Sequence, residues 1–185
     1  MNKKVRKLLE TLTEGELLVV PPTWKTPATN YPSKKQGSAE IAKDKHKEGL
    51  YLMEGVAGYD FYYVEKEIPL TVLKINGETA MVDDPMHWFG MKLFGEKASG
   101  KVLVGGLGLG LITFSLDLNP FVEEVDIIEL NKDVIKLVKP FVPKRKIKIR
   151  QGNVYDFKWF KKDYDTIILD LWVRGEGKEG VKKRG

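Results

Sequence analysis

Cysteine is absent from this 185-residue chain, and histidine occurs only as His46 and His87. Without cysteine the chain can form neither disulfide bonds nor thiolate metal sites. The two histidines are far apart in the sequence, so we expect no bound metal and no Ser-His-Asp triad. No apolar run approaches the roughly 20 residues of a membrane-spanning helix, and no signal-peptide core follows the basic N-terminus. These absences predict a cytoplasmic protein with no metal and no membrane contact.

Neither sign of charge dominates, since 31 basic residues face 26 acidic ones and the net charge is +5. The basic residues are spread along the chain, with local clusters at 3–7, 143–150 and 182–184. This spread favours a solvated surface over a nucleic-acid site. The lysine- and glutamate-rich composition is typical of proteins from heat-adapted organisms. We therefore expect a folded domain whose partner is a small molecule rather than nucleic acid.

The N-terminal half divides into three segments by its pattern. Residues 1–20 predict a short amphipathic helix followed by a short strand. Residues 21–48 are rich in proline, lysine and small polar residues and show no period, so we expect an irregular linker or a lid. Residues 49–98 predict a small antiparallel β-unit and a connecting helix. The Asn76-Gly77 pair is a strong hairpin signal, and Pro85 begins the helix after an aspartate cap.

From residue 99 to 172 strands alternate with helices. Apolar runs of strand type are separated by segments of helical period, and such alternation implies a parallel sheet with right-handed crossovers. The expected strands lie at 101–105, 125–130, 147–150 and 166–170. The fold class we predict is α/β: a truncated Rossmann-like parallel sheet of about four β/α units, preceded by the antiparallel unit. In such sheets ligands bind at the carboxyl ends of the strands.

A glycine-rich turn follows the first of these strands. Gly106, Gly108 and Gly110 have the spacing G-x-G-x-G. Glycine lets the chain turn sharply and lets a ligand approach the backbone, and the following helix directs N–H groups at that ligand. A dinucleotide fingerprint would need a third glycine where Leu111 stands. The spacing therefore disfavours a dehydrogenase.

Three polar residues end the other strands. Glu129 lies 19 residues after Gly110, where a carboxylate can accept both hydroxyls of a ribose. Asn153 follows the third strand and can accept a hydrogen bond from a base or simply form a turn. Asp170 ends the fourth strand, where it could bind an ammonium group or take a proton from a nucleophile. The sequence thus predicts a nucleoside site at one edge of the sheet.

These residues together resemble the class I S-adenosylmethionine-dependent methyltransferases, and within them the spermidine synthase-like group. The resemblance covers 70–172 and depends on three motifs: the hairpin at 73–79 with Asp83-Asp84-Pro85-Met86-His87, the glycine strand at 102–106, and Glu129 with the helix at 131–135. It implies S-adenosylmethionine or its decarboxylated form as the cofactor. The implied cofactor-binding residues are Gly106, Leu107, Gly108, Gly110, Glu129 and Asn153. The implied acceptor residues are Asp84, His87 and Trp172, with Asp170 as the catalytic acid or base.

The motif departs from the spermidine synthase pattern at the acceptor. Position 173 is valine where a second acid is usual, and Met86 stands in place of a tyrosine. We therefore expect a methyltransferase-like enzyme first and an aminopropyltransferase acting on a polyamine second. A catalytically silent binding or assembly module on the same fold is the third hypothesis.

The last segment, 173–185, is a basic, glycine-rich tail. The strand at 166–170 would then lie at the edge of the sheet, and an exposed apolar edge favours association. We expect either the N-terminal β-unit or a partner subunit in a homo-oligomer to cover it.

Overall fold

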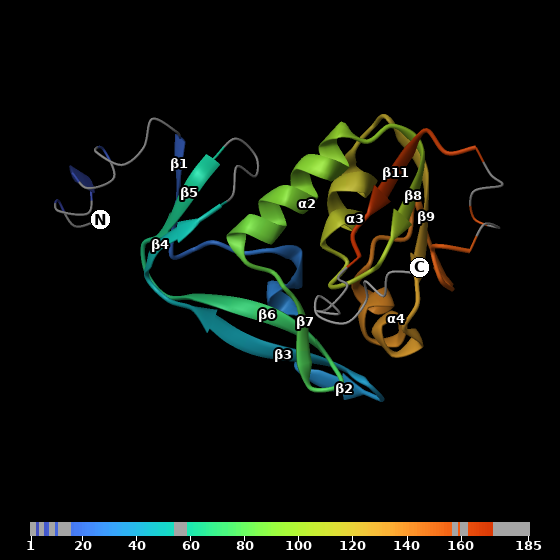
Figure 1. Cartoon of the computed structure of the whole chain (residues 1–185), viewed down its shortest axis with the longest axis horizontal. Coiled ribbons are helices and arrows are strands. Elements are labelled where there is room, and N and C mark those ends of the chain that lie inside the picture. The colour runs from blue at the N-terminus through green and yellow to red at the C-terminus, as the bar shows by residue number, and fades with distance from the viewer. Residues whose placement is uncertain are drawn as a thin grey trace, which may run out of the picture.

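The computed structural model describes residues 16–53, 59–156, 159 and 163–171, together with 3, 6, 7 and 10 (Figure 1). Most of the helix expected in residues 1–20, the tail at 173–185 and Trp172 lie outside the described residues. No helix within the described ranges is both long and apolar enough to cross a membrane.

The C-terminal half is a parallel four-stranded sheet of the predicted kind. Its strands are β8 (Gly100–Gly105), β9 (Val122–Glu129), β10 (Ile147–Gln151) and β11 (Thr166–Leu169), in the order β10-β9-β8-β11. Helix α3 (Leu111–Leu118) connects β8 to β9, and α4 (Lys132–Val138) with the short 3-10 helix η3 (Lys139–Phe141) follows β9. The prediction of a mixed α/β, truncated Rossmann-like fold is confirmed.

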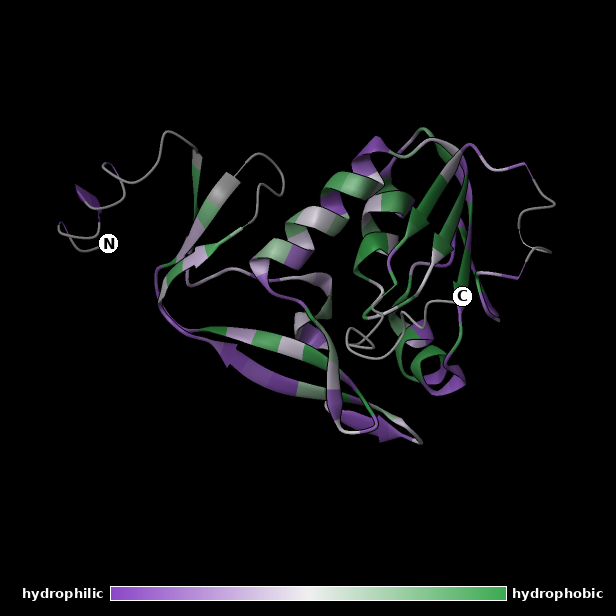
Figure 2. Ribbon diagram, in the orientation of Figure 1, coloured by the Kyte–Doolittle hydropathy of each residue, from purple (hydrophilic) through white to green (hydrophobic). Residues whose placement is uncertain are grey.

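The two faces of this sheet differ in how many hydrophobic residues pack against them. Because side chains alternate along a strand, Val102 and Val104 pack into the main core while Leu103 faces the opposite side. The main core lies under α2 (Pro85–Lys97), α3 and α4, and Figure 2 shows hydrophobic residues along the central strands. The second face has a smaller cluster around Leu103, Ile128 and Val154. The principal stabilising layer is therefore on the helix side.

Strand β11 lies at the edge of the sheet. Among the described residues it pairs with β8 alone, and Ile167 and Leu169 are 49% and 53% exposed. The idea that the N-terminal β-unit covers this strand is wrong, since the N-terminal strands form sheets of their own. Cover by a partner subunit stays a prediction.

The N-terminal half contains two small sheets rather than one antiparallel unit. One has the order β1-β5-β4 and the other β2-β3-β6-β7. The bounds are Glu16–Val20 for β1, Gly49–Leu52 for β4, Tyr59–Val64 for β5, Ile68–Ile75 for β6 and Glu78–Val82 for β7. The strands predicted between 49 and 83 are present, but β5 pairs in parallel with β1, and β6 pairs with β3. The partner strands β1 and β3 lie further upstream in the chain. The pattern of residues within a strand does not show which distant strand it pairs with.

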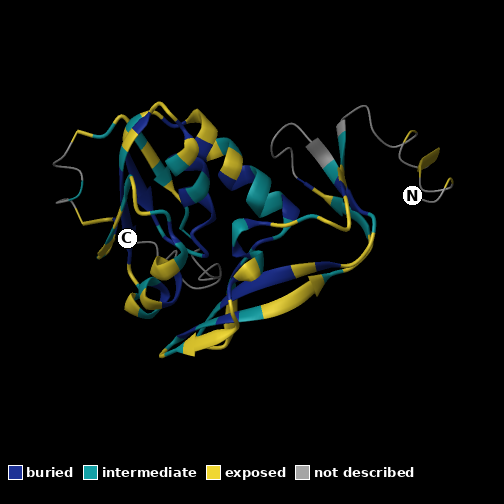
Figure 3. Ribbon diagram, turned by 180° about the vertical axis from the view of Figure 1, so that it is seen from behind, coloured by how far each residue is buried: buried dark blue, intermediate teal, exposed yellow. Residues whose placement is uncertain are grey.

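Residues 21–48 are the clearest correction to the sequence analysis. They are not an irregular linker: they contain the 3-10 helix η1 (Pro27–Asn30) and the hairpin of β2 (Lys34–Gln36) and β3 (Ala39–His46). The hairpin escaped detection because its strands are mostly polar. Only one side of β3 is buried, at Ala39 and Ile41, and Figure 3 shows β3 largely exposed beside the buried β6.

The hairpin signal and the helix cap were predicted correctly. Asn76 and Gly77 join β6 to β7 with positive φ values of 53° and 83°, as a two-residue turn of this composition requires. Helix α2 (Pro85–Lys97) begins after Asp84, whose carboxylate accepts the His87 N–H at 2.9 Å. Local signals of this kind were sufficient wherever the turn or cap is made by adjacent residues.

Asp83 joins the segments of the N-terminal half. Its side chain is fully buried and accepts hydrogen bonds from the Thr26 hydroxyl and the Thr71 N–H. Burial raises the pKa of Asp83, although these hydrogen bonds and the charge of Lys43 oppose that shift. Each buried donor left without an acceptor costs about 1–3 kcal/mol.

Asp83→Ala is therefore expected to lower the free energy of unfolding by about 2–4 kcal/mol, measured by urea denaturation at neutral pH. The matched control is Asp44→Ala, at an exposed position of β3, which we expect to change the free energy by less than about 0.5 kcal/mol. Equal stabilities of the two variants would show that the buried carboxylate does not tie these segments together.

Candidate functional site

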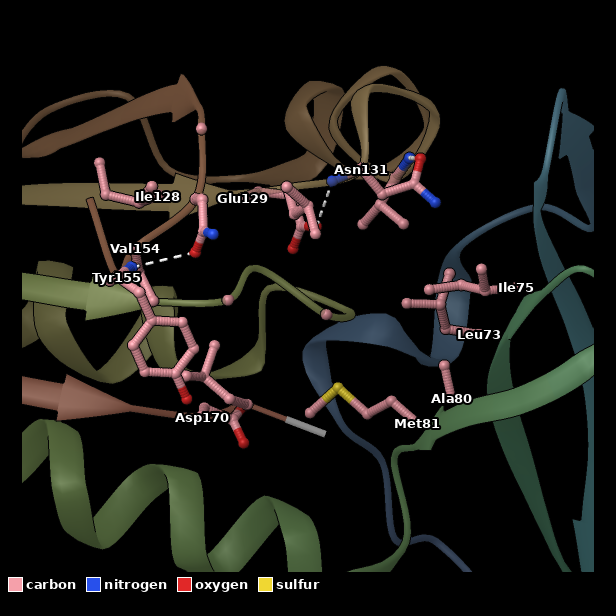
Figure 4. A pocket seen from close by; sticks show the side chains of 17 residues that line it. Leu73, Ile75, Ala80, Met81, Ile128, Glu129, Asn131, Val154, Tyr155 and Asp170 are labelled. Atoms are coloured by element: carbon pink, nitrogen blue, oxygen red, sulfur yellow. Dashed lines mark hydrogen bonds between the residues drawn. The ribbon is translucent and has the colours of Figure 1, made fainter. Parts of the chain in front are cut away.

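A cavity of about 380 Å³ lies between the carboxyl ends of the parallel strands and the β6–β7 hairpin. Figure 4 shows its two sides: Glu129, Val154 and Asp170 lie at or beyond the carboxyl ends of the parallel strands, and Leu73 and Met81 lie on the hairpin. Its volume lies in the range of small-molecule sites, about 300–1,000 Å³. The site edge predicted from the strand order thus coincides with a cavity.

The glycine turn forms the floor beside β8. Gly106 has φ 94° and Gly108 has φ 51°, both in the left-handed region that favours glycine. A Cβ on Gly106 would lie 2.3 Å from the backbone oxygen of Asp170, and one on Gly108 would lie 2.4 Å from the Met81 sulfur. Conformation favours glycine at both positions, and space requires it at Gly106, where the close atom belongs to the backbone. Both glycines line the cavity.

Glu129 is held in place by the backbone. Its Oε2 accepts the Leu107 N–H at 2.8 Å and its Oε1 accepts the Asn131 N–H at 2.7 Å. The side chain is 9% exposed, and it lines the cavity. A carboxylate has about four acceptor positions, so each oxygen keeps capacity for one further donor. The arrangement can receive a pair of hydroxyl groups on the cavity side.

Asn153 lines the cavity as predicted, but its amide also serves the local turn. Its Oδ1 accepts the Tyr155 N–H at 3.0 Å, and its main-chain oxygen accepts the Trp159 indole N–H at 2.7 Å. Tyr155 forms part of the same lining (Figure 4). Asn153 therefore both forms the turn and lines the cavity, where its amide could contact a base.

Asp170 projects from the end of β11 into the cavity (Figure 4). Its N–H donates to the Gly105 carbonyl at 2.9 Å, which extends the β8–β11 ladder and fixes the backbone. Burial raises the pKa of Asp170, and the charge of His87 opposes this shift. Glu129 and Asp170 are the charged side chains among the described residues of the lining. The cavity thus favours a cationic ligand over an anionic one.

His87 lies in a neighbouring cavity of about 480 Å³ around the β6–β7 hairpin, which shares Ile75, Ala80 and Met81 with the first. Its Nδ1 lies 3.4 Å from the Asp84 carboxylate. Burial lowers the pKa of His87, but the hydrogen bond and charge of Asp84, with the charge of Asp170, outweigh it and raise that pKa. The charges of Asp84 and Asp170 thus favour the protonated form of His87.

Three of the predicted residues take indirect positions. Leu107 and Gly110 are absent from the described lining. Leu107 has a buried side chain and gives only its N–H to Glu129, while Gly110 caps α3 at φ 72° against Val138 and Val142. Asp84 caps α2 and pairs with His87.

The sequence analysis missed the residues of the opposite wall. Leu73 and Met81 come from the β6–β7 hairpin, which the sequence analysis used as a family motif but not as a source of site residues. Met81 is buried, and its sulfur lies 3.2 Å from the Leu109 N–H of the glycine turn. Asn131 was also missed as a site residue, although an asparagine directly before a helix is a recognisable cap signal.

Comparisons with known proteins give similarity in structure alone. The sequence matches no established family model, and no curated protein matches it.

The solved structures that resemble part of the chain include two spermidine synthases and a dimethyladenosine transferase. Spermidine synthase from Thermotoga maritima is 21% identical with a TM-score of 0.42, over 56% of this chain and 41% of that one. A spermidine synthase in complex with the transition-state analogue AdoDATO is 22% identical with a TM-score of 0.42, over 54% and 40%. A dimethyladenosine transferase from Plasmodium falciparum is 17% identical with a TM-score of 0.38, over 51% and 34%. The chain spans about two fifths of the length of the two synthases, and at these identities the likeness concerns the fold alone.

Proposed function

We propose that this chain is a transferase that binds an adenosyl sulfonium compound, S-adenosylmethionine or its decarboxylated form, in the 380 Å³ cavity. The observation that carries the proposal is the Glu129 carboxylate, held by two backbone N–H groups beside a glycine turn. A carboxylate at this strand end is suited to a ribose because it can accept from two neighbouring hydroxyls at once.

The donor set and the space fit such a ligand. Glu129 would hold the ribose, and Gly106 and Gly108 leave room that a Cβ would fill. Ile128 and Val154 give apolar walls for a base, and the Asn153 amide can accept a hydrogen bond from it. The carboxylate of Asp170 lines the same cavity and would stabilise the positive charge of the bound sulfonium by electrostatic attraction.

The bound sulfonium supplies an activated alkyl group for transfer to a nucleophile. The role of this chain is then mainly to position the two reactants, which can account for much of a rate enhancement. Asp170 would hold a cationic acceptor or take its proton. His87 lines the adjoining cavity together with Met81, and its charge would act on the acceptor through Asp170.

The charge of the cavity favours a second, finer candidate. Both charged side chains in its described lining are acids, so the carboxylate of S-adenosylmethionine would meet no cation there. The decarboxylated form carries no such group. This observation supports aminopropyl transfer to an amine as an alternative to methyl transfer.

The ligand class can be tested by isothermal titration of the chain with S-adenosylmethionine, its decarboxylated form and NAD in parallel. We expect binding of one or both adenosyl compounds at micromolar concentration and none of NAD. Tighter binding of the decarboxylated form would favour aminopropyl transfer. Absence of binding by either adenosyl compound at millimolar concentration would contradict the proposal and favour a catalytically silent module.

Binding of a sulfonium ligand is expected to depend on pH through Asp170. Since burial raises the pKa of this carboxyl group, it takes up its proton at a higher pH than an ordinary aspartate. Affinity for the cation should therefore be highest above that pKa and decrease as the pH falls through it, by at most about tenfold per pH unit for one group. Titrations from the ordinary pKa of an aspartate, about 4, up to pH 8 measure this.

Asp170→Asn is the matched control for that titration, because it keeps the shape of the side chain and leaves His87 in place. We expect weaker binding at pH 8 and a flatter pH profile in this variant. An unchanged profile would assign the pH dependence to His87 rather than Asp170.

A further inference from the structure

The β2–β3 turn contacts the start of α4, across the boundary between the N-terminal sheet and the parallel sheet. The Ser38 N–H donates to the Asp133 carboxylate at 3.0 Å, and the Ser38 hydroxyl donates to the same oxygen at 3.2 Å. Gly37 has φ 53°, and a Cβ there would lie 2.3 Å from that carboxylate oxygen. The turn therefore approaches α4 as closely as glycine allows.

Asn131 links this turn to the candidate ribose-binding carboxylate. Its Oδ1 accepts the N–H groups of Asp133 at 2.8 Å and Val134 at 3.4 Å, as a helix cap does. This leaves its amide Nδ2 to donate to the Ser38 hydroxyl at 3.1 Å. The Asn131 main-chain N–H donates to Glu129 Oε1 at 2.7 Å. Ser38 thus lies two hydrogen bonds away from Glu129.

The hydrogen-bond roles along this path are mutually consistent. The Ser38 hydroxyl has a single proton and two acceptors in reach, Asp133 Oδ2 at 3.2 Å and Asn131 Oδ1 at 3.5 Å. The shorter contact, to the charged Asp133, takes the proton, and a lone pair of the hydroxyl then accepts from the Asn131 amide. Asn131 in turn uses its side-chain oxygen, its side-chain amide and its main-chain N–H in three different directions. The orientation of Asn131 is therefore fixed from both sheets.

We propose that Ser38 is a positioning residue for ribose binding: it fixes Asn131, and through Asn131 it holds Glu129 in the geometry that receives the ribose hydroxyls. This inference rests on the proposed function. It also gives the N-terminal hairpin a role in the site beyond forming a wall. Loss of the Ser38 hydroxyl removes the hydrogen bond that it donates to the Asp133 carboxylate and the neutral one that it accepts from Asn131. The bond to Asn131 is the one that leads to Glu129, so the expected effect on affinity is about threefold to tenfold.

The test uses two neutral nucleosides, 5′-methylthioadenosine and its 2′,3′-dideoxy analogue. Ser38→Ala should weaken binding of the first by about threefold to tenfold and leave binding of the second almost unchanged. Ser38→Thr, which keeps a hydroxyl, should restore the affinity. Ser33→Ala, at an exposed position before β2, is the matched control and should change neither. In a Glu129→Ala background Ser38→Ala should add no further loss.

Hydrogen exchange of the main-chain N–H of Asn131, which donates to Glu129, gives a second readout and is measured by NMR without ligand. We expect faster exchange in Ser38→Ala than in Ser33→Ala. An equal loss of affinity for both nucleosides, or no change in either affinity or exchange, would overturn the positioning role. If the unaltered chain binds neither nucleoside, the proposed function itself fails, and that outcome is distinct from a failure confined to Ser38.

Discussion

Glu129→Ala is expected to weaken binding of an adenosyl nucleoside by at least about 100-fold. Hydrogen bonds to a charged group contribute about 1.5–3 kcal/mol each, and the carboxylate would receive two from the ribose. A total of about 3 kcal/mol corresponds to roughly two powers of ten in the dissociation constant. The substitution also leaves the Leu107 and Asn131 N–H groups without their acceptor, so the turn would lose its shape as well. Isothermal titration of both proteins measures the effect.

Glu123→Ala is the matched control for this experiment. Glu123 lies on the same strand, β9, but is exposed, so its removal should leave affinity unchanged. Thermal unfolding of both variants separates lost binding from lost folding, because a folded Glu129→Ala protein that does not bind has lost the site, contact and turn together, but not the fold. Equal affinity of Glu129→Ala and the unaltered chain would remove the basis for placing a ribose on this carboxylate.

Gly106→Ala is expected to have the largest effect on stability. A side chain at φ 94° costs about 1–2 kcal/mol, and the added Cβ would lie 2.3 Å from the backbone oxygen of Asp170. That oxygen cannot move without displacing the end of β11. Such overpacking costs a further amount of about 1–3 kcal/mol. We expect a loss of about 2–5 kcal/mol, or a decrease of roughly 5–15 °C in the melting temperature.

Gly77→Ala separates the two causes of that loss. Gly77 has a similar positive φ of 83°, but a Cβ there would meet no atom within 4 Å. Its loss should therefore be limited to the conformational cost, about 1–2 kcal/mol. If the two variants unfold at the same temperature in calorimetry, the close approach of β11 to the glycine turn is not a constraint on the fold.

The sequence was most informative where one short segment defines both structure and chemistry. The turn at Gly106 follows directly from a buried strand, and Glu129 and Asp170 end strands with a clear apolar pattern. Because parallel strands bring their carboxyl ends to one edge, linear order was enough to place these residues in one cavity.

The rest of the site depends on pairings between distant segments. The wall that contains Met81 is in place because β6 pairs with β3, a strand whose polar residues resemble those of a loop. Ser38 contacts Asp133 across 95 positions of the sequence. No periodicity within either segment specifies such a contact, since it is made by the packing of two sheets. The sequence therefore predicted the parallel-sheet side of the cavity and missed the side formed by the β6–β7 hairpin.

A crystal structure of the chain, determined from crystals grown in the presence of 5′-methylthioadenosine, would test the central claim most directly. The account predicts electron density for the nucleoside in the cavity between the glycine turn and Met81, with both ribose hydroxyls within hydrogen-bond distance of the Glu129 carboxylate. Density at another place, or a nucleoside whose ribose does not contact Glu129, would contradict the assignment of this cavity as an adenosyl site.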